Sequence, residues 1–330
     1  MKIVVDAMGG DHAPEAVVEG AVAAVREFAT EVILVGDTSR IQQLLKKNKY
    51  SGGAISVQQA SEVVDMHDAA ASSIRKKRDS SIVVGLNLVK EGKAEAFFSA
   101  GNTGAVACGA VLTLGLLPGI ERPGIGIVMP TLKLPSFIID VGANIDPKPA
   151  HLLQYGIMAD AYMRGIFNRN NPSIGLLNVG EEESKGTGFV KETHELLEKS
   201  QLNFIGNVEG KDLFSGKCDI VICDGFVGNV ALKVTESLAE ALQEFLKRHI
   251  KSNPWGILGV MLLRGSLMRF KKDIDYSEYG GAPLLGVDGV VIIGHGRSNV
   301  KAIKNAIRVA AQEVEHNVNT GIIEAIKLKN

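Results

Sequence analysis

Short apolar runs alternate along this chain with longer stretches of helical periodicity. The apolar runs, rich in β-branched residues, predict strands at 3–5, 32–35, 54–57, 96–99, 125–129, 137–140, 174–178, 204–208, 220–223 and 290–293. The longer stretches predict helices at 15–28, 41–47, 83–90, 104–114, 152–167, 190–199, 230–248 and 300–317. This alternation is typical of an α/β fold with a doubly wound, mostly parallel sheet that is sandwiched by helices.

Length and composition are sufficient for a large apolar core. The chain has 330 residues, of which 45% are hydrophobic. We expect residues 1–330 to form one large α/β domain, although the length would also suit two lobes, with 147–150 as a weak junction.

Charge and cysteine content narrow the class of protein. The formal net charge is −1, so no overall field favours nucleic acid. Cys108, Cys218 and Cys223 lie inside apolar runs without metal-ligand spacing, as expected in a reducing compartment. The first residues do not read as a signal peptide, and no apolar run has the length of a membrane span. We therefore expect a cytoplasmic protein with neither metal nor other cofactor.

The residues that follow each predicted strand are the first candidates for chemistry, because ligands bind outside the carboxyl ends of strands in such sheets. The first run is followed by Asp6, the glycine pair Gly9 and Gly10, and His12. The glycines would let backbone N–H groups converge on a ligand. The alternative is an ordinary glycine turn in which Asp11 caps the next helix.

The fourth run leads into a loop at 99–104 and then directly into a helix. Gly101, Asn102, Thr103 and Gly104 stand where free N–H groups and the helix dipole meet, which favours anion binding. The alternative is a normal capped helix, with Asn102 or Thr103 as the cap. The loop matches neither GxGxxG nor Walker A, so it does not imply a nucleotide.

Four further loops carry polar residues at strand ends. They contribute Asn144, Asn178 with Lys185, Asn229, and His295 between two glycines. Lys185 suits phosphate binding, although its acidic neighbours could instead hold it in a surface ion pair. His295 is a candidate acid or base, and a purely structural histidine is the alternative.

Taken together, these loops are more informative than any one of them. We expect one edge of the sheet to gather them into a broad cleft that is rich in N–H donors. The sequence contains no GxSxG nucleophile elbow. Such a cleft suits anion binding and stabilisation of an oxyanion.

The segment at 247–272 has a different composition. It is strongly apolar between basic flanks, too short to span a bilayer, and typical of an interfacial helix. We expect it to protrude and to contact a membrane or an acidic carrier protein through Trp255, Leu258, Leu262 and Arg264. The alternative is a buried helix or a dimer interface.

Six sequence blocks resemble the bacterial phosphate acyltransferase family, and the match runs essentially end to end. They are KIVVDAMGGDHAP at 2–14, SAGNTG at 99–104, DVGAN at 140–144, NVGEE at 178–182, DGFVGN at 224–229 and YGGAPLLG at 279–286. The resemblance implies the fold of phosphotransacetylases and isocitrate/isopropylmalate dehydrogenases, a homodimer and peripheral membrane association. It also implies transfer of a fatty acyl group from acyl carrier protein to inorganic phosphate. The product, acyl phosphate, would feed a membrane glycerol-3-phosphate acyltransferase, which is a further candidate partner.

The residues are compatible with that reaction. Phosphate is already a nucleophile and a thioester is already activated, so the protein mainly has to position them and stabilise the oxyanion. We expect the 101–104 loop to supply donors, Lys185 to neutralise charge, and His295 or His12 to protonate the leaving thiolate. Two alternatives remain open, a NAD-dependent dehydrogenase of the related fold and a non-catalytic scaffold of lipid synthesis.

Overall fold

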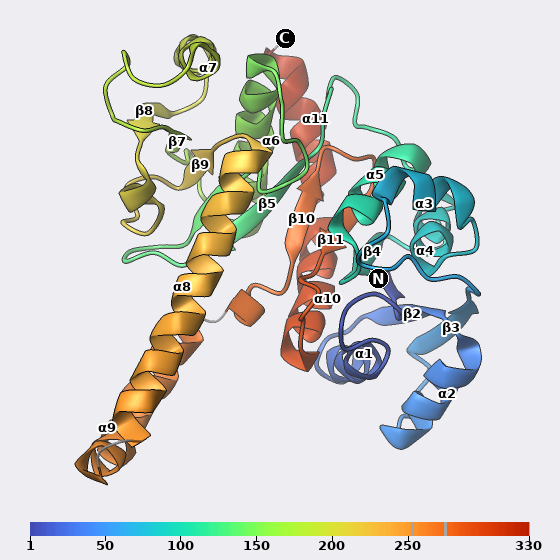
Figure 1. The fold of residues 1–330 in the computed structure, drawn as a ribbon. Helices are drawn as coiled ribbons and strands as arrows, with labels where there is room; N and C mark the ends of the chain where they lie inside the picture. The colour runs from blue at the N-terminus through green and yellow to red at the C-terminus, as the bar shows by residue number, and fades with distance from the viewer. Residues whose placement is uncertain (252–253, 274–275, 330) are drawn as a thin grey trace.

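The computed structural model describes residues 1–251, 254–273 and 276–329. Its centre is an 11-stranded sheet in the order β3-β2-β1-β4-β11-β10-β5-β6-β9-β7-β8 (Figure 1). The strands are β1 (Lys2–Asp6), β2 (Glu31–Gly36), β3 (Ile55–Gln59), β4 (Ala96–Ser99), β5 (Gly124–Met129), β6 (Ser136–Ile139), β7 (Ile174–Leu177), β8 (Phe204–Val208), β9 (Ile220–Ile222), β10 (Ala282–Leu285) and β11 (Val290–Ile293).

Helices cover the sheet and extend from it. They are α1 (Glu15–Glu27), α2 (Thr38–Lys47), α3 (Ala70–Lys76), α4 (Ser81–Lys90), α5 (Thr103–Thr113), α6 (Pro149–Phe167), α7 (Gly188–Glu198), α8 (Gly225–Lys251), α9 (Pro254–Asp273), α10 (Val300–Glu315) and α11 (Val318–Lys329). Two short 3-10 turns lie at Gly210–Leu213 and Tyr276–Glu278. The expected mostly parallel α/β architecture is confirmed.

The sheet contains two groups of parallel strands that run in opposite senses. Strands β3, β2, β1, β4 and β11 are parallel to one another, and so are β6, β9, β7 and β8. Between them, β10 and β5 make three antiparallel pairings, and an odd number of reversals leaves the two groups opposed. The expectation of one edge with all the loops is therefore wrong. The loops form two clusters, one for each group.

Close packing between neighbouring helices and between neighbouring strands depends on small residues. A Cβ added to Gly20 in α1 would lie 2.7 Å from Ile303 of α10, and one added to Gly126 in β5 would overlap Phe137 of β6. Phe137 is fully buried and stacks on Tyr162 of α6, with ring centroids 4.6 Å apart. A larger side chain at either glycine would therefore force its neighbours apart, because a close-packed interior tolerates little added volume.

Every strand predicted from the sequence is present in the structure, but the sequence patterns do not predict some of the elements that form. Strand β10 was not expected, because Pro283 and the flanking glycines at 280, 281 and 286 indicate a turn. Helices α3 and α11 were also not expected. Helix α8 begins at Gly225, so Asn229 lies inside the helix and not in a loop before it.

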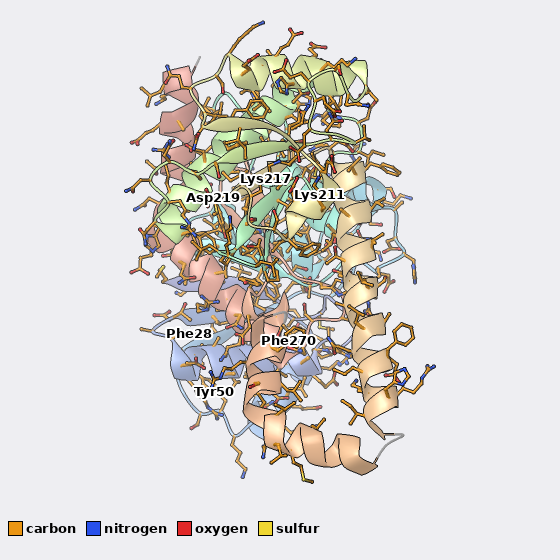
Figure 2. All side chains as sticks on the ribbon, turned by 90° about the vertical axis from the view of Figure 1, so that its left-hand side faces the viewer. Phe28, Tyr50, Lys211, Lys217, Asp219 and Phe270 are labelled. Atoms are coloured by element: carbon orange, nitrogen blue, oxygen red, sulfur yellow. The ribbon has the colours of Figure 1, made fainter. Side chains whose placement is uncertain are left out.

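Helices α8 and α9 lie side by side and extend away from the sheet (Figures 1 and 2). Both carry exposed apolar side chains, among them Leu242 and Phe245 on α8 and Leu262 on α9. Arg264 is also exposed, whereas the side chains of Trp255 and Leu258 fall outside the described residues. Among those described, no helix is both long and apolar enough to cross a membrane.

Candidate active site

Asp6 ends β1 and organises the first cluster of loops. Its carboxylate accepts hydrogen bonds from the Ser99 hydroxyl at 2.7 Å and from the Met8 backbone at 3.0 Å. It is almost completely buried, and this burial raises its pKa although the hydrogen bonds oppose the shift. Asp6 therefore ties the end of β1 to the end of β4, and its carboxylate faces protein atoms.

Asn102 is the N-cap of α5. Its Oδ1 accepts the Ala105 N–H, and its Nδ2 donates to the carbonyls of Asp65, Met66 and Asp68. The capped-helix interpretation is thus correct for this side chain, whose donors are occupied by the 65–68 segment. Within the described chain, the backbone N–H groups of Thr103 and Gly104 make no hydrogen bond. These two donors at the helix start can meet an anion.

Three loops meet around Gly10. A Cβ added there would lie 3.1 Å from the carbonyls of both Ala100 and Gly296, and the Gly10 φ is +103°. The Asp11 N–H donates to the Gly296 carbonyl at 2.8 Å. Asp11 does not cap α1, because Pro14 holds that position without a side-chain bond. The loops at 6–12, 99–104 and 294–299 therefore form one cluster, as expected from their strands, and it includes the exposed His12.

His295 is linked to the opposite half of the sheet through α8. Its Nε2 lies 3.2 Å from the ammonium of Lys233 and 3.7 Å from the Glu236 carboxylate. Its Nδ1 accepts the Arg297 backbone N–H at 3.1 Å, while its Nε2 faces the Lys233 ammonium, which is a donor as well. Burial, and next the charge of Lys233, lower the pKa of His295 below its ordinary value. The ring is therefore mostly neutral at neutral pH.

The second cluster is built on Asp140, which follows β6. Its two carboxylate oxygens accept the backbone N–H groups of residues 125, 142, 143 and 144. Burial nevertheless raises the pKa of Asp140. Asn144 donates to the Pro123 carbonyl and to the Tyr155 hydroxyl, each at 2.6 Å. The amide donors of Asn144 thus serve the fold, and its predicted contact with substrate stays a prediction.

Asn178 shapes the loop that carries Lys185. Its Nδ2 donates to the Lys185 carbonyl, and its Oδ1 accepts the Val179 N–H. The Lys185 side chain is exposed, and in the described part of the chain it forms no ion pair. The neighbouring Glu181 pairs with Lys211 and Lys217, which Figure 2 labels. The surface ion pair considered for Lys185 is therefore absent from the described residues.

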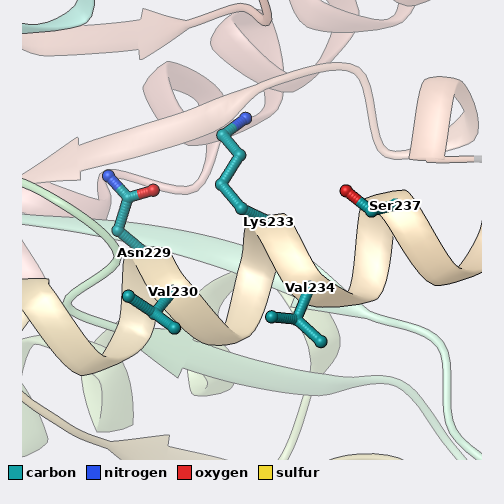
Figure 3. A pocket seen from close by; sticks show the side chains of 5 residues that line it. All are labelled: Asn229, Val230, Lys233, Val234 and Ser237. Atoms are coloured by element: carbon teal, nitrogen blue, oxygen red, sulfur yellow. The ribbon is translucent and has the colours of Figure 1, made fainter.

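The first turns of α8 pack directly against the Asp140 loop. A Cβ on Gly228 would overlap the Asp140 carbonyl, and one on Gly142 would lie 3.0 Å from the Asn229 amide nitrogen. A depression of about 410 Å³ follows along the helix. Figure 3 shows Asn229, Lys233 and Ser237 on one side of α8, with Val230 and Val234 beside them. The depression thus combines polar and apolar side chains between the two clusters.

Two of the three cysteines, Cys218 and Cys223, lie in surroundings that do not favour a nucleophile. Burial raises the pKa of Cys218 to about 12 and shifts that of Cys223 upward as well. The Cys223 thiol donates to the Asp140 carbonyl at 3.3 Å. A thiolate is disfavoured at both positions.

Sequence patterns do not identify Lys233 as a site residue. The lysine falls within a regular helical pattern, and only the register of α8 places it beside His295. Its neighbour Glu236, three residues later, is the one local signal, because such pairs often lie on one helix face.

The arrangement can bind an anion and stabilise developing negative charge. Among the residues that the structure describes, it offers free backbone donors at the start of α5, an exposed lysine without an ion pair at residue 185, and a neutral histidine. Within the described residues, no three His, Cys, Asp or Glu side chains gather as metal ligands.

Comparisons with known proteins identify the family. A family model described as "Fatty acid synthesis protein" matches residues 1–321. The phosphate acyltransferase of Geotalea uraniireducens is 51% identical over 327 residues, covering 99% of this chain and 94% of that protein. That of Dictyoglomus turgidum is 51% identical over 328 residues, covering 99% and 98%. This chain belongs to the phosphate acyltransferase family. It is an acyltransferase enzyme of fatty acid synthesis, as the resemblance implied.

Solved structures confirm the fold expected of a phosphate acyltransferase. A phosphotransacetylase from Streptococcus pyogenes has a TM-score of 0.67 at 19% identity, covering 96% of this chain and 94% of that one. A 4-hydroxythreonine-4-phosphate dehydrogenase from Klebsiella pneumoniae has a TM-score of 0.52 at 15% identity, covering 95% and 99%. At such identities the likeness concerns the fold alone. Family membership therefore favours an acyltransferase over the two alternatives, a NAD-dependent dehydrogenase of the related fold and a non-catalytic scaffold of lipid synthesis.

Proposed function

We propose that this enzyme transfers a fatty acyl group from acyl carrier protein to inorganic phosphate and releases acyl phosphate for phospholipid synthesis. The observation that supports this best is the first cluster, where the Thr103 and Gly104 N–H groups are unoccupied at the start of α5. A helix start with free donors suits phosphate or an oxyanion.

The described residues suggest a division of roles. The α5 start binds phosphate or the oxyanion, and Lys185 neutralises charge. A phosphate oxygen attacks the thioester carbonyl, the C–S bond then breaks, and no covalent enzyme intermediate is needed. Because His295 is mostly neutral, we leave protonation of the thiolate to His12. Asn229 and Lys233 line the adjoining depression and contact the substrate there.

Partners and location form part of the same proposal. The exposed apolar faces of α8 and α9 suit a homodimer and a peripheral membrane surface in the cytoplasm. Acyl phosphate is reactive and amphiphilic, which suits direct use as a substrate by a membrane glycerol-3-phosphate acyltransferase.

The test is a direct assay of the purified enzyme with long-chain acyl carrier protein and labelled phosphate. We expect labelled acyl phosphate, trapped by hydroxylamine as the hydroxamate. Failure to form it under conditions where the carrier remains acylated and the enzyme folded would refute the proposed donor and acceptor. NAD binding, followed by cofactor fluorescence, should be absent.

A further inference from the structure

A second depression, of about 500 Å³, is lined by residues from α3, α4 and α5 and lies outside the two loop clusters. Figure 1 shows these three helices close together. Apolar side chains from all three helices line it, namely Ile74, Val83 and Leu112. Ile74 and Val83 are buried, whereas Leu112 is 53% exposed. An exposed leucine beside a concave apolar lining indicates a surface that a ligand could cover.

The rest of the lining is positively charged. Arg75, Arg78 and Lys90 face this depression, and no carboxylate lines it among the described residues. None of the three takes part in an ion pair in the described part of the chain, although the Arg78 Nε donates to the Arg75 carbonyl. The whole chain has 36 basic and 37 acidic residues, so this uncompensated charge is a local feature. It favours an acidic ligand.

Two helices, α3 and α5, connect the depression to the loop at 99–104. At one end, α3 starts beside α5, where a Cβ on Gly104 would lie 3.2 Å from the Cβ of Ala70. At the other end, a Cβ on Gly109 would lie 3.4 Å from Ile74. The 11 residues of α5 span about 16 Å, so the depression stands roughly that far from the free donors.

We propose that this depression docks an acidic, amphipathic helix of the acyl carrier that delivers the thioester, an inference that rests on the proposed function. A carrier presents its acyl group at the end of a long flexible arm, so its protein body must dock at a distance from the reacting carbon. An apolar lining with cations at its rim complements such a helix. The lining is concave and lies between helices, which a flat lipid surface does not fit. Inorganic phosphate has no apolar group that could contact the apolar part of the lining.

The experiment compares the wild type with R75E/R78E in two measurements. Steady-state kinetics should show KM for acyl carrier protein raised about tenfold or more, with kcat at saturation and KM for phosphate unchanged. Fluorescence anisotropy with labelled acyl carrier protein should show the same loss of affinity and a weaker dependence on salt. A carrier-free donor, such as acyl-N-acetylcysteamine, should react equally well with both enzymes.

Matched variants control for folding and for general charge. K46E/K47E reverses two exposed lysines on α2 and should leave carrier affinity unchanged. If R75E/R78E melts early, Leu112→Ala, which removes an exposed side chain, replaces it in both measurements. Unchanged carrier affinity in a folded variant would overturn the docking site while leaving the proposed function intact. An equal loss in K46E/K47E, or a loss of binding to anionic vesicles instead of carrier, would also overturn it. A wild type that forms no acyl phosphate from any donor would instead refute the proposed function.

Discussion

Lys185 and Lys233 differ in their surroundings, although we place both near substrate. Lys233 is held between Glu236 and His295, whereas Lys185 is exposed and forms no ion pair among the described residues. An unpaired cation on a glycine-rich loop gains a partner only when an anion arrives. A cation held beside a histidine acts mainly on that histidine.

We expect Lys185→Ala to lower kcat/KM about ten- to hundredfold with little change in thermal stability. A charge-assisted contact made in the transition state is worth about 1.5–3 kcal/mol. Lys191→Ala, an exposed lysine on the following helix, serves as the control and should retain activity. Wild-type turnover by a folded Lys185→Ala enzyme would remove this lysine from the mechanism.

The second residue-scale prediction concerns pH. Lys233→Met removes a positive charge that lowers the pKa of His295, so that pKa should rise. Protonation at Nδ1 takes away the acceptor of the Arg297 N–H, so activity should fall as pH drops through this pKa. The acidic limb of the profile of kcat/KM against pH should therefore move to higher pH, together with the NMR titration of the His295 ring. Superimposable profiles for the two enzymes would show that Lys233 does not influence the histidine.

Residue identities at the site could be predicted better than their roles. The sequence places Asp6, Asn102 and Asn144 at the ends of strands, and in the structure Asp6 is the last residue of β1 while the two asparagines follow β4 and β6. Their side chains, however, hydrogen-bond to protein groups, and this depends on partners distant in the chain, such as Ser99 for Asp6 and Pro123 for Asn144. Short-range patterns carry no information on such partners.

At the scale of elements, periodicity finds most strands and helices but not their directions. The strand β10 contains a proline between glycine turns, and its two antiparallel pairings help to reverse the second half of the sheet. Without β10, alternating strands and helices predict a uniformly parallel sheet with one row of loops. The physical reason for the difference is tertiary pairing, which overrides a local turn signal.

The hairpin of α8 and α9 gives a prediction at this scale. Met261 and Leu262 are 68% and 80% exposed, so M261E/L262E should leave the thermal transition almost unchanged. If this face enters a membrane, removing roughly 3–6 kcal/mol of apolar burial should sharply reduce co-sedimentation with anionic vesicles. Activity on a carrier-free thioester should persist.

The control for this variant is K46E/K47E, which adds more negative charge far from the hairpin. Full sedimentation of M261E/L262E with vesicles would exclude lipid as the partner of this face. An early melt would instead indicate that the face packs against protein.

At the scale of the whole molecule, the exposed apolar side chains of α8 require an explanation. Leu238, Leu242, Phe245 and Leu246 are all about half exposed on this one helix. Exposed apolar surface concentrated on one element usually marks an interface. In the proposed homodimer, the α8 helices of two copies would cover it.

We expect L238E/L242E to convert a dimer into a folded monomer, because paired carboxylates would be buried at such an interface. Sedimentation velocity at several protein concentrations measures the change. The conservative variant L238M/L242M keeps the apolar volume and should stay dimeric. A dimer that survives L238E/L242E would place the interface elsewhere.

The length of the hairpin has a geometric consequence. Glu240 of α8 pairs with Arg297 in a loop of the sheet, and the helix continues to Lys251. These 11 further residues form a stiff rod of about 16 Å. With the tip on a bilayer, the rod acts as a spacer that keeps the reaction centre in water while fixing its height above the lipid. That height is the distance an acyl phosphate must cross after release. Lengthening or shortening both helices by whole turns would change this distance and leave every residue of the two loop clusters as it is.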